Sequence, residues 1–172
     1  ICAVNIMRNV ISIIVLFFVQ CIFFSIVVEG HGTSASSFAL FNLKGDLISY
    51  RTEIKKKNLL VAFFASYCIP CRAEIPKLVE IANNNQDKVK LLLINIDKEG
   101  AVKAVKFLSD VNVNNKAECL LDMYQHVVTQ YIPEKKIPAF FLINKNGKVL
   151  MKSIGDDSRS IKKLQKVIKN IK

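Results

Sequence analysis

Residues 62–76 read Ala-Phe-Phe-Ala-Ser-Tyr-Cys-Ile-Pro-Cys-Arg-Ala-Glu-Ile-Pro, an apolar run that leads directly into two cysteines separated by two residues. We expect a strand, then the cysteines at the first turn of a helix. One helical turn brings both side chains onto one face, so Cys68 and Cys71 can close a small disulfide with little backbone movement. The open helix N-terminus favours the thiolate of Cys68 over its thiol, and the cation of Arg72 should add to this preference.

Two other interpretations of a CxxC pair fit the sequence less well. A zinc site needs two more ligands at short spacing from the pair. None of the remaining cysteines and histidines lies at such a spacing; they are Cys2, Cys21, Cys119, His31 and His126. A purely structural disulfide gains more by closing a long loop than by spanning two residues. We therefore predict a redox-active pair, with no metal and no cofactor beyond the disulfide itself.

The composition indicates one globular domain with an added segment. The chain has 172 residues, of which 51% are hydrophobic, and a formal net charge of +11. Its lysines are spread along the chain and are not interleaved with aromatic residues in any nucleic-acid-binding motif, so we predict no nucleic-acid partner. A basic surface of this kind favours anionic membranes or acidic partners.

Residues 1–28 are predicted to be a signal peptide or a membrane anchor. Residues 10–28 carry no charge, and Arg8 precedes them. About 20 apolar residues suffice to span a bilayer, so both interpretations stay open, and small residues at 33–36 could host cleavage. Residues 29–37 are small and polar and are predicted to be a linker, which leaves residues 38–172 for the folded domain.

The order of elements in that domain predicts an α/β fold. Residues 59–65 and 91–96 are continuous apolar runs typical of strands buried on both faces, and the helix opened by Cys68 lies between them. Such a βαβ unit makes the two strands parallel and places the cysteines at the carboxyl edge of the first. Two hairpins are expected, around Gly45 and around Asn146-Gly147.

Amphipathic helices are predicted for most of the remaining chain. Residues 98–110 should form one with Val102, Val105 and Leu108 on its apolar face, and residues 123–131 and 158–172 should form two more. Cys119 lies in a short apolar piece and is interpreted as a small buried hydrophobe. His126 has no ligand partner at a useful spacing.

Together these features resemble the thioredoxin fold, and in particular the TlpA/ResA-type membrane-tethered thiol–disulfide oxidoreductases. The resemblance covers about residues 38–171. It depends on Phe-Phe-Ala-Ser-Tyr-Cys-Ile-Pro-Cys-Arg-Ala-Glu-Ile-Pro, on Leu-Ile-Asn-Lys-Asn-Gly-Lys after Ile137-Pro138, and on the order of elements between them. It implies a central mixed β-sheet flanked by helices.

The resemblance also implies roles for individual residues. Cys68 would be the attacking thiol and Cys71 the resolving thiol, with Pro138 as a cis-proline beside the sulfurs. The backbone of Ile137 would pair with an extended substrate chain. Glu74 matches the acidic residue common after the second cysteine, although a solvated helical glutamate explains it equally well.

Two residues depart from the pattern. Tyr67 stands where the family usually has tryptophan, which changes the rim around Cys68 but keeps an aromatic residue there. Ala62 stands where thioredoxin itself has a buried aspartate that helps to deprotonate the resolving thiol. Cys71 then needs another base or water. ResA-type members also lack this aspartate, so the departure narrows the subfamily.

From these residues we predict a periplasmic or otherwise extracytoplasmic enzyme that exchanges disulfides with protein substrates. The resemblance implies a reductant of apocytochrome c or of copper-site cysteines, supplied with electrons by a membrane partner. A DsbA-like oxidant is the alternative direction. A copper-carrying protein would favour a wider CxxxC pair and a suitably placed histidine, and the sequence has neither. Only an assay distinguishes a redox-inactive binding module from an active enzyme.

Overall fold

The computed structural model describes residues 34–171, so the predicted anchor or signal peptide at 1–28 lies outside the described residues. Within 34–171, no helix is both long and apolar enough to cross a bilayer. The elements in chain order are β1 Ala39–Phe41, β2 Leu47–Ser49, α2 Tyr50–Lys56, β3 Asn58–Phe64, α3 Ile69–Asn83, β4 Val89–Asn95, α4 Ala101–Asp110, β5 Glu118–Leu121, α5 His126–Tyr131, β6 Ala139–Ile143, β7 Val149–Ile154 and α6 Ser158–Asn170.

Five strands form the central sheet, in the order β5-β4-β3-β6-β7. The strands β3, β4 and β5 are parallel to one another, β6 runs antiparallel to β3, and β7 runs antiparallel to β6. The predicted βαβ unit is therefore confirmed, and β3 is buried along its whole length, as a central strand covered on both faces should be. The mixed sheet with flanking helices is the thioredoxin-like arrangement expected from the sequence.

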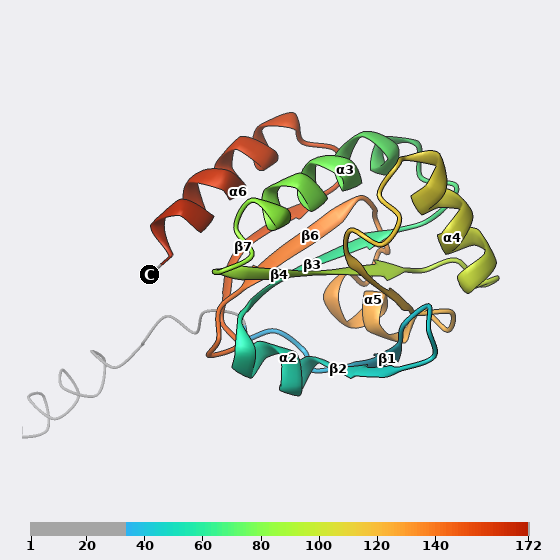
Figure 1. Cartoon of the computed structure of the whole chain (residues 1–172), viewed down its shortest axis with the longest axis horizontal. Helices are drawn as coiled ribbons and strands as arrows, with labels where there is room; N and C mark the ends of the chain where they lie inside the picture. The colour runs from blue at the N-terminus through green and yellow to red at the C-terminus, as the bar shows by residue number, and fades with distance from the viewer. Residues whose placement is uncertain (1–33, 172) are drawn as a thin grey trace, which may run out of the picture. The chain divides into compact units, whose positions relative to one another are not determined.

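Helices cover both faces of this sheet (Figure 1), and the strand alternation divides the core between them. Leu60, Ala62 and Phe64 of β3 point into the cluster beneath α3, α4 and α6. Leu59, Val61 and Phe63 point into the cluster beneath α2, α5 and the β1–β2 hairpin. Because both sides of β3 are filled, the position at which it ends is fixed by two cores.

Both predicted hairpins are confirmed. β1 pairs with β2 across a turn that contains Gly45 at φ +86°, and β6 pairs with β7 across Asn144–Lys148, where Gly147 has φ +80°. The second turn also holds the first described residues of the chain. Ser34 forms a bridge with Lys148, and the N–H of Ala35 donates to the carbonyl of Gly147 at 2.9 Å.

The helix α2 was not predicted. The lysine run at 55–57 masks the helical pattern in the sequence. Tyr50 and Ile54, which lie one helical turn apart, are both buried. Lysines in a last helical turn interact favourably with the helix dipole. The run thus ends a short helix whose inner face packs on β3.

The prediction for α4 was right about the helix and about Leu108 on its buried face, but wrong about the two valines. Val102 and Val105 are 76% and 49% exposed, whereas Ala104, Phe107 and Leu108 are buried. Phe107 packs on Phe64, with ring centroids 4.8 Å apart. Burying a phenylalanine removes more apolar area from water than burying a valine, so Phe107 sets the helix rotation and the valines are left in solvent.

Candidate active site

The two cysteines lie where β3 ends and α3 begins. Cys68 is the N-cap residue of α3 and has an extended backbone, and Cys71 lies in the first turn. Three residues connect Phe64 to Cys68, and the N–H of Cys68 donates to the carbonyl of Ala65 at 3.1 Å. The pair therefore occupies the carboxyl edge of the parallel strands, where open α/β sheets place their sites.

Cys68 and Cys71 form a disulfide with a Cα–Cα distance of 5.3 Å. The N–H of Cys71 donates to the sulfur of Cys68 at 3.3 Å, which is the bond an N-cap side chain makes to an unpaired helix donor. Cys68 retains 5% of its exposure and Cys71 none. The two cysteines are therefore not equivalent, because only Cys68 keeps any exposed surface.

A buried carboxylate holds the loop that leads to Cys68. Asp97 follows β4 and is 3% exposed. Its two oxygens accept the backbone N–H of Ser66 at 2.8 Å and the hydroxyl of Ser66 at 2.9 Å, and the amide of Asn95 donates to it at 2.7 Å. This network ties the approach to Cys68 to the end of the neighbouring strand.

Sequence analysis did not identify Asp97 or Ser66 as part of the site. The available signal is that Asp97 is an acidic residue immediately after the apolar run 91–96. Parallel strands end at the same edge of a sheet, so an acid after β4 is well placed to contact the loop after β3.

Ile137 and Pro138 reach the same edge from β6. Ala139 pairs with Phe63 in the antiparallel register, so Pro138 lies just beyond, level with the end of β3. The Ile137–Pro138 peptide bond is cis. The carbonyl of Pro138 accepts the N–H of Gly155 at 2.7 Å, whereas the N–H and C=O of Ile137 make no hydrogen bond within residues 34–171.

Glu74 is buried and not the solvated helical glutamate that was the alternative. It is 7% exposed, lies one helical turn after Cys71, and its Oε1 has no hydrogen-bond partner among the described residues. Burial, reinforced by the negative charge of Asp156, raises the pKa of Glu74 to about 7, and Lys77 offsets only part of this. A carboxyl group that titrates near neutrality thus lies close to the buried thiol of Cys71.

Arg72 and Tyr67 occupy the rim of the site. The guanidinium of Arg72 lies 3.5 Å from the carboxylate of Asp110 and 5.4 Å from the ring centroid of Phe107. Its charge is partly neutralised there, so the expected support for a Cys68 thiolate is weaker than the sequence suggested. Tyr67 is 67% exposed and stands beside Cys68.

Cys119 is a buried thiol in β5, as predicted. It is 3% exposed, and burial, together with the charge of Glu118, raises its pKa to about 12. A thiol with so little thiolate at neutral pH is chemically inert. No group of three or more metal-ligating side chains gathers within residues 34–171.

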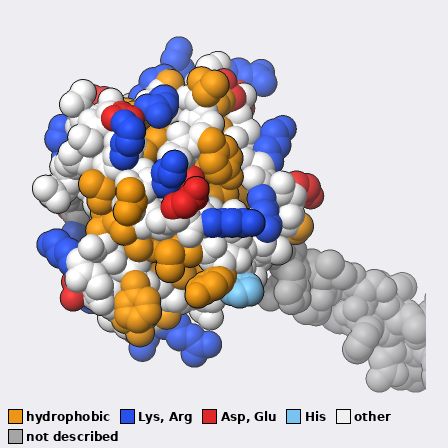
Figure 2. Space-filling model, turned by 90° about the vertical axis from the view of Figure 1, so that its right-hand side faces the viewer, with side chains coloured by type: hydrophobic (Ala, Val, Ile, Leu, Met, Phe, Trp, Pro, Cys, Tyr) orange, Lys and Arg blue, Asp and Glu red, His pale blue; other side chains and the backbone are white. Residues whose placement is uncertain are grey.

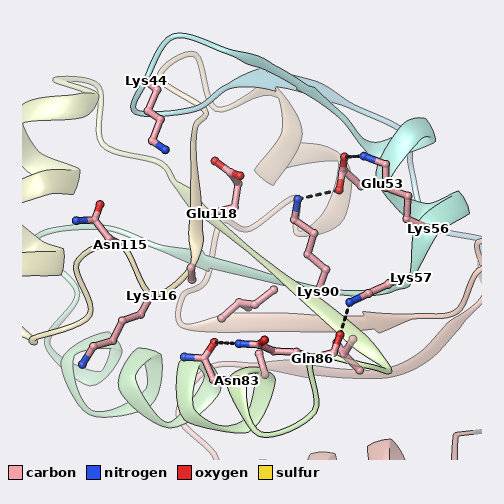
Figure 3. Close-up of a pocket in the computed structure, with 14 residues that line it drawn as sticks. Lys44, Glu53, Lys56, Lys57, Asn83, Gln86, Lys90, Asn115, Lys116 and Glu118 are labelled. Carbon is pink, nitrogen blue, oxygen red and sulfur yellow. Dashed lines mark hydrogen bonds and ion pairs between the residues drawn. The ribbon is translucent and has the colours of Figure 1, made fainter.

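A pocket of about 550 Å³ lies at the opposite edge of the sheet, where β4 and β5 begin (Figure 3). Its polar side chains largely satisfy one another. Lys56 and Lys90 each place Nζ 2.8 Å from a carboxylate oxygen of Glu53, and Figure 3 shows these three side chains converging. Burial alone would raise the pKa of Glu53, but the two lysines hold it below its usual value. We assign this pocket no part in the chemistry of the disulfide.

The family model described as Redoxin matches residues 31–168. The chain belongs to the Redoxin family. Thiol-disulfide oxidoreductase ResA of a Bacillus cereus strain is 28% identical over 130 residues, which cover 74% of this chain and 72% of the relative. ResA of Bacillus subtilis (strain 168) is 26% identical over 131 residues, covering 76% and 70%.

Solved structures of redoxin-type proteins have the same fold. A thiol:disulfide interchange protein DsbE from Chlorobium tepidum superposes with a TM-score of 0.69 at 25% identity and covers 80% of this chain and 94% of its own. A protein disulfide isomerase from Bacteroides thetaiotaomicron gives 0.72 at 22% identity, covering 80% and 87%, which supports the fold alone. Its family, fold and CxxC pair make the protein a thiol–disulfide oxidoreductase that is similar to ResA.

The network around Asp97 predicts the effect of one substitution on this redoxin. In Asp97→Asn an amide NH₂ replaces one acceptor, so at least one Ser66 donor loses its partner and the loop before Cys68 loosens. We expect the rate of small-disulfide reduction to fall about tenfold and the free energy of unfolding to fall by about 1–3 kcal/mol. Asp87→Asn, which changes an exposed acid before β4, is the matched control. Unchanged kinetics in Asp97→Asn would contradict a positioning role.

Glu74 predicts a pH-dependent stability. Because folding raises its pKa from 4.5 to about 7, the folded protein holds a proton that the unfolded chain releases, and stability is lost as pH rises through this window. Glu74→Gln removes this loss. Its advantage in the free energy of unfolding should therefore grow between pH 4.5 and 8, by up to about 3 kcal/mol.

Denaturant titrations across this pH range measure the effect. Glu80→Gln, at an exposed position of the same helix, is the control. A difference between Glu74→Gln and the wild type that stays constant with pH would show that Glu74 ionises as freely in the folded protein as in the unfolded chain.

Proposed function

We propose that this redoxin is an extracytoplasmic reductant of protein disulfides. The observation that carries the proposal is the asymmetry of the pair: Cys68 is at the helix N-terminus and reaches solvent, while Cys71 is fully buried behind it. An attacking thiol must meet a disulfide on another protein, whereas a resolving thiol needs to meet only its neighbour.

The reaction takes two exchange steps. The thiolate of Cys68 attacks one sulfur of the substrate disulfide and forms a mixed disulfide, and the other substrate sulfur leaves as a thiolate. Cys71 then attacks the sulfur of Cys68 and releases the second substrate thiol. Two electrons pass to the substrate, and the enzyme is left as the Cys68–Cys71 disulfide, which a membrane-bound dithiol partner must reduce again.

Proton transfer at Cys71 is assigned to Glu74. Ala62 leaves no acid on the adjoining strand, and Glu74 lies one turn away with an unpartnered oxygen. With a pKa of about 7 it can take a proton from Cys71 at neutral pH and return it in the reverse direction.

Substrate alignment is assigned to the segment before β6. The free backbone groups of Ile137 lie at the edge of the site and can pair with an extended chain, as an added strand does. The exposed ring of Tyr67 adds to the surface that this chain would contact, whereas Pro138 is buried.

The direction of electron flow is assigned from the weak support for a thiolate. Cys68 receives a helix N-terminus and one backbone N–H, and Arg72 is already paired with Asp110. Strong oxidants stabilise their reduced form through a very acidic thiol. A site with so few stabilising groups keeps a stable disulfide and acts as a reductant, of apocytochrome c or of copper-site cysteines. The uncharged stretch at 10–28 supports a place outside the cytoplasm, next to the membrane.

Variants that each replace one cysteine with serine test this mechanism. Cys68→Ser should abolish reduction of a protein disulfide, because the buried Cys71 cannot reach it. Cys71→Ser should accumulate a mixed disulfide through Cys68, visible on a non-reducing gel and lost on adding dithiothreitol. Cys119→Ser, which removes a buried thiol outside the site, should behave as wild type. Mixed disulfides that form through Cys71 instead would reverse the assignment.

A further inference from the structure

The most exposed apolar side chains lie toward the edge of the sheet that carries the disulfide. Within residues 34–171, the four large apolar residues with the highest exposure are Tyr124 at 81%, Ile69 at 79%, Val102 at 76% and Tyr67 at 67%. Each belongs to a segment that follows one of the parallel strands β3, β4 and β5, so all four lie toward one edge of the sheet. Figure 2, which looks at the side of the molecule where α4 lies, shows hydrophobic side chains gathered among lysines and arginines.

Two adjoining hollows connect part of this surface. One, of about 470 Å³, is lined by Tyr67, Lys98, Lys103 and Gln125 among others. The next, of about 540 Å³, is lined by Lys98, Met123, Tyr124 and Gln125. Because Lys98 and Gln125 line both hollows, the two are adjacent. Together they are called here the Tyr67–Tyr124 groove, and one end of it is lined by Tyr67, the residue before Cys68.

The far wall of the groove is held rigidly. The N–H of Asp122 donates to the carbonyl of Asn95 at 2.8 Å, and its buried carboxylate accepts the N–H of Val128 at 2.8 Å. The side-chain amide of Gln125 donates to the carbonyl of Ile96 at 3.0 Å. The turn that carries Met123 and Tyr124 is thus fixed to the end of β4.

Met123 also fixes this turn against α4. Gly100 has φ +59°, and a Cβ placed on it would lie 2.5 Å from the sulfur of Met123. The positive φ favours glycine at the start of α4, and the Met123 side chain lies against it. A groove whose walls are already ordered loses little conformational freedom when it binds a partner.

The charged side chains that line the groove indicate which charge a partner should carry. Lys98 and Lys103 line the groove with ammonium groups, while the carboxylate of Asp97 is buried and engaged by Ser66 and Asn95. Glu99 is the one exposed acid among the lining residues that the structure describes there. The balance favours a negatively charged group on the partner.

We propose that the Tyr67–Tyr124 groove binds the substrate polypeptide on one side of its reacting cysteine, and that it selects an extended segment with an apolar or aromatic residue and an acidic residue. The proposal rests on the proposed function and adds its substrate preference. It also explains why α4 leaves valines in solvent at the site edge: they extend an apolar surface on which a partner can pack.

Three disulfide substrates test the groove with the full-length protein. Two are ten-residue peptides whose single cysteine is a mixed disulfide with a chromophoric thiol, flanked by Phe and Glu in one and by Ser and Lys in the other. The third is glutathione disulfide. Wild type should reduce the Phe/Glu peptide with a kcat/KM about tenfold above that of the Ser/Lys peptide.

Variants locate the preference. Tyr124→Ser should lower kcat/KM for the Phe/Glu peptide about fivefold to tenfold, mainly through KM, and leave glutathione disulfide unchanged. Lys98→Gln should reduce the advantage of the acidic residue. Leu47→Ser, at a 60% exposed apolar residue of the β1–β2 hairpin, is the control and should change nothing.

The outcomes separate the two proposals. If wild type reduces glutathione disulfide but treats both peptides alike, or if Leu47→Ser behaves as Tyr124→Ser, the groove does not select substrate and the reductase assignment stands. If wild type reduces none of the three disulfide substrates, the proposed function fails and the groove proposal fails with it.

Discussion

The chemistry of this protein depends on one junction, where a strand buried on both faces becomes a helix. The core fixes the end of β3. The first N–H groups of the helix that follows have no hydrogen-bond partner within the helix. Cys68 occupies the N-cap position, and its sulfur accepts a hydrogen bond from one of these groups, the N–H of Cys71. Its sulfur is therefore set by two cores and a helix terminus, and it does not depend on a mobile loop.

Burial on the inner side of this junction supports the resolving role proposed for the second cysteine. Cys71 lies in the first turn of α3 with no exposure, and Glu74 follows it one turn later into the same interior. The burial that shields Cys71 from disulfides of other proteins also raises the pKa of the Glu74 carboxyl toward neutrality. The same environment thus separates the two thiols and creates a group able to carry protons between states.

Features set by local sequence were predicted well, and features set by tertiary contacts were not. The strand into CxxC, the parallel βαβ unit and both glycine turns follow from short-range patterns, and the structure confirms them. The solvent-facing valines of α4 were missed, because Phe107 competes for the same core and hydrophobic periodicity does not rank the competitors. The Asp97–Ser66 contact joins residues 31 positions apart, which no local pattern reports. Arg72 was placed near the sulfurs by its position in sequence, and its pairing with Asp110 came only from the fold.

The reduction potential of the Cys68–Cys71 pair tests the account most directly, because it measures how strongly the folded protein prefers the disulfide. It can be measured on the full-length protein by equilibration in dithiothreitol or glutathione buffers, with Cys119→Ser as the control for the buried Cys119 thiol. The few groups that support a Cys68 thiolate predict a potential nearer to that of thioredoxin, about −270 mV, than to that of DsbA, about −120 mV. A potential above about −150 mV, together with a Cys68 pKa near 4, would contradict the reductant assignment and identify the protein as an oxidant.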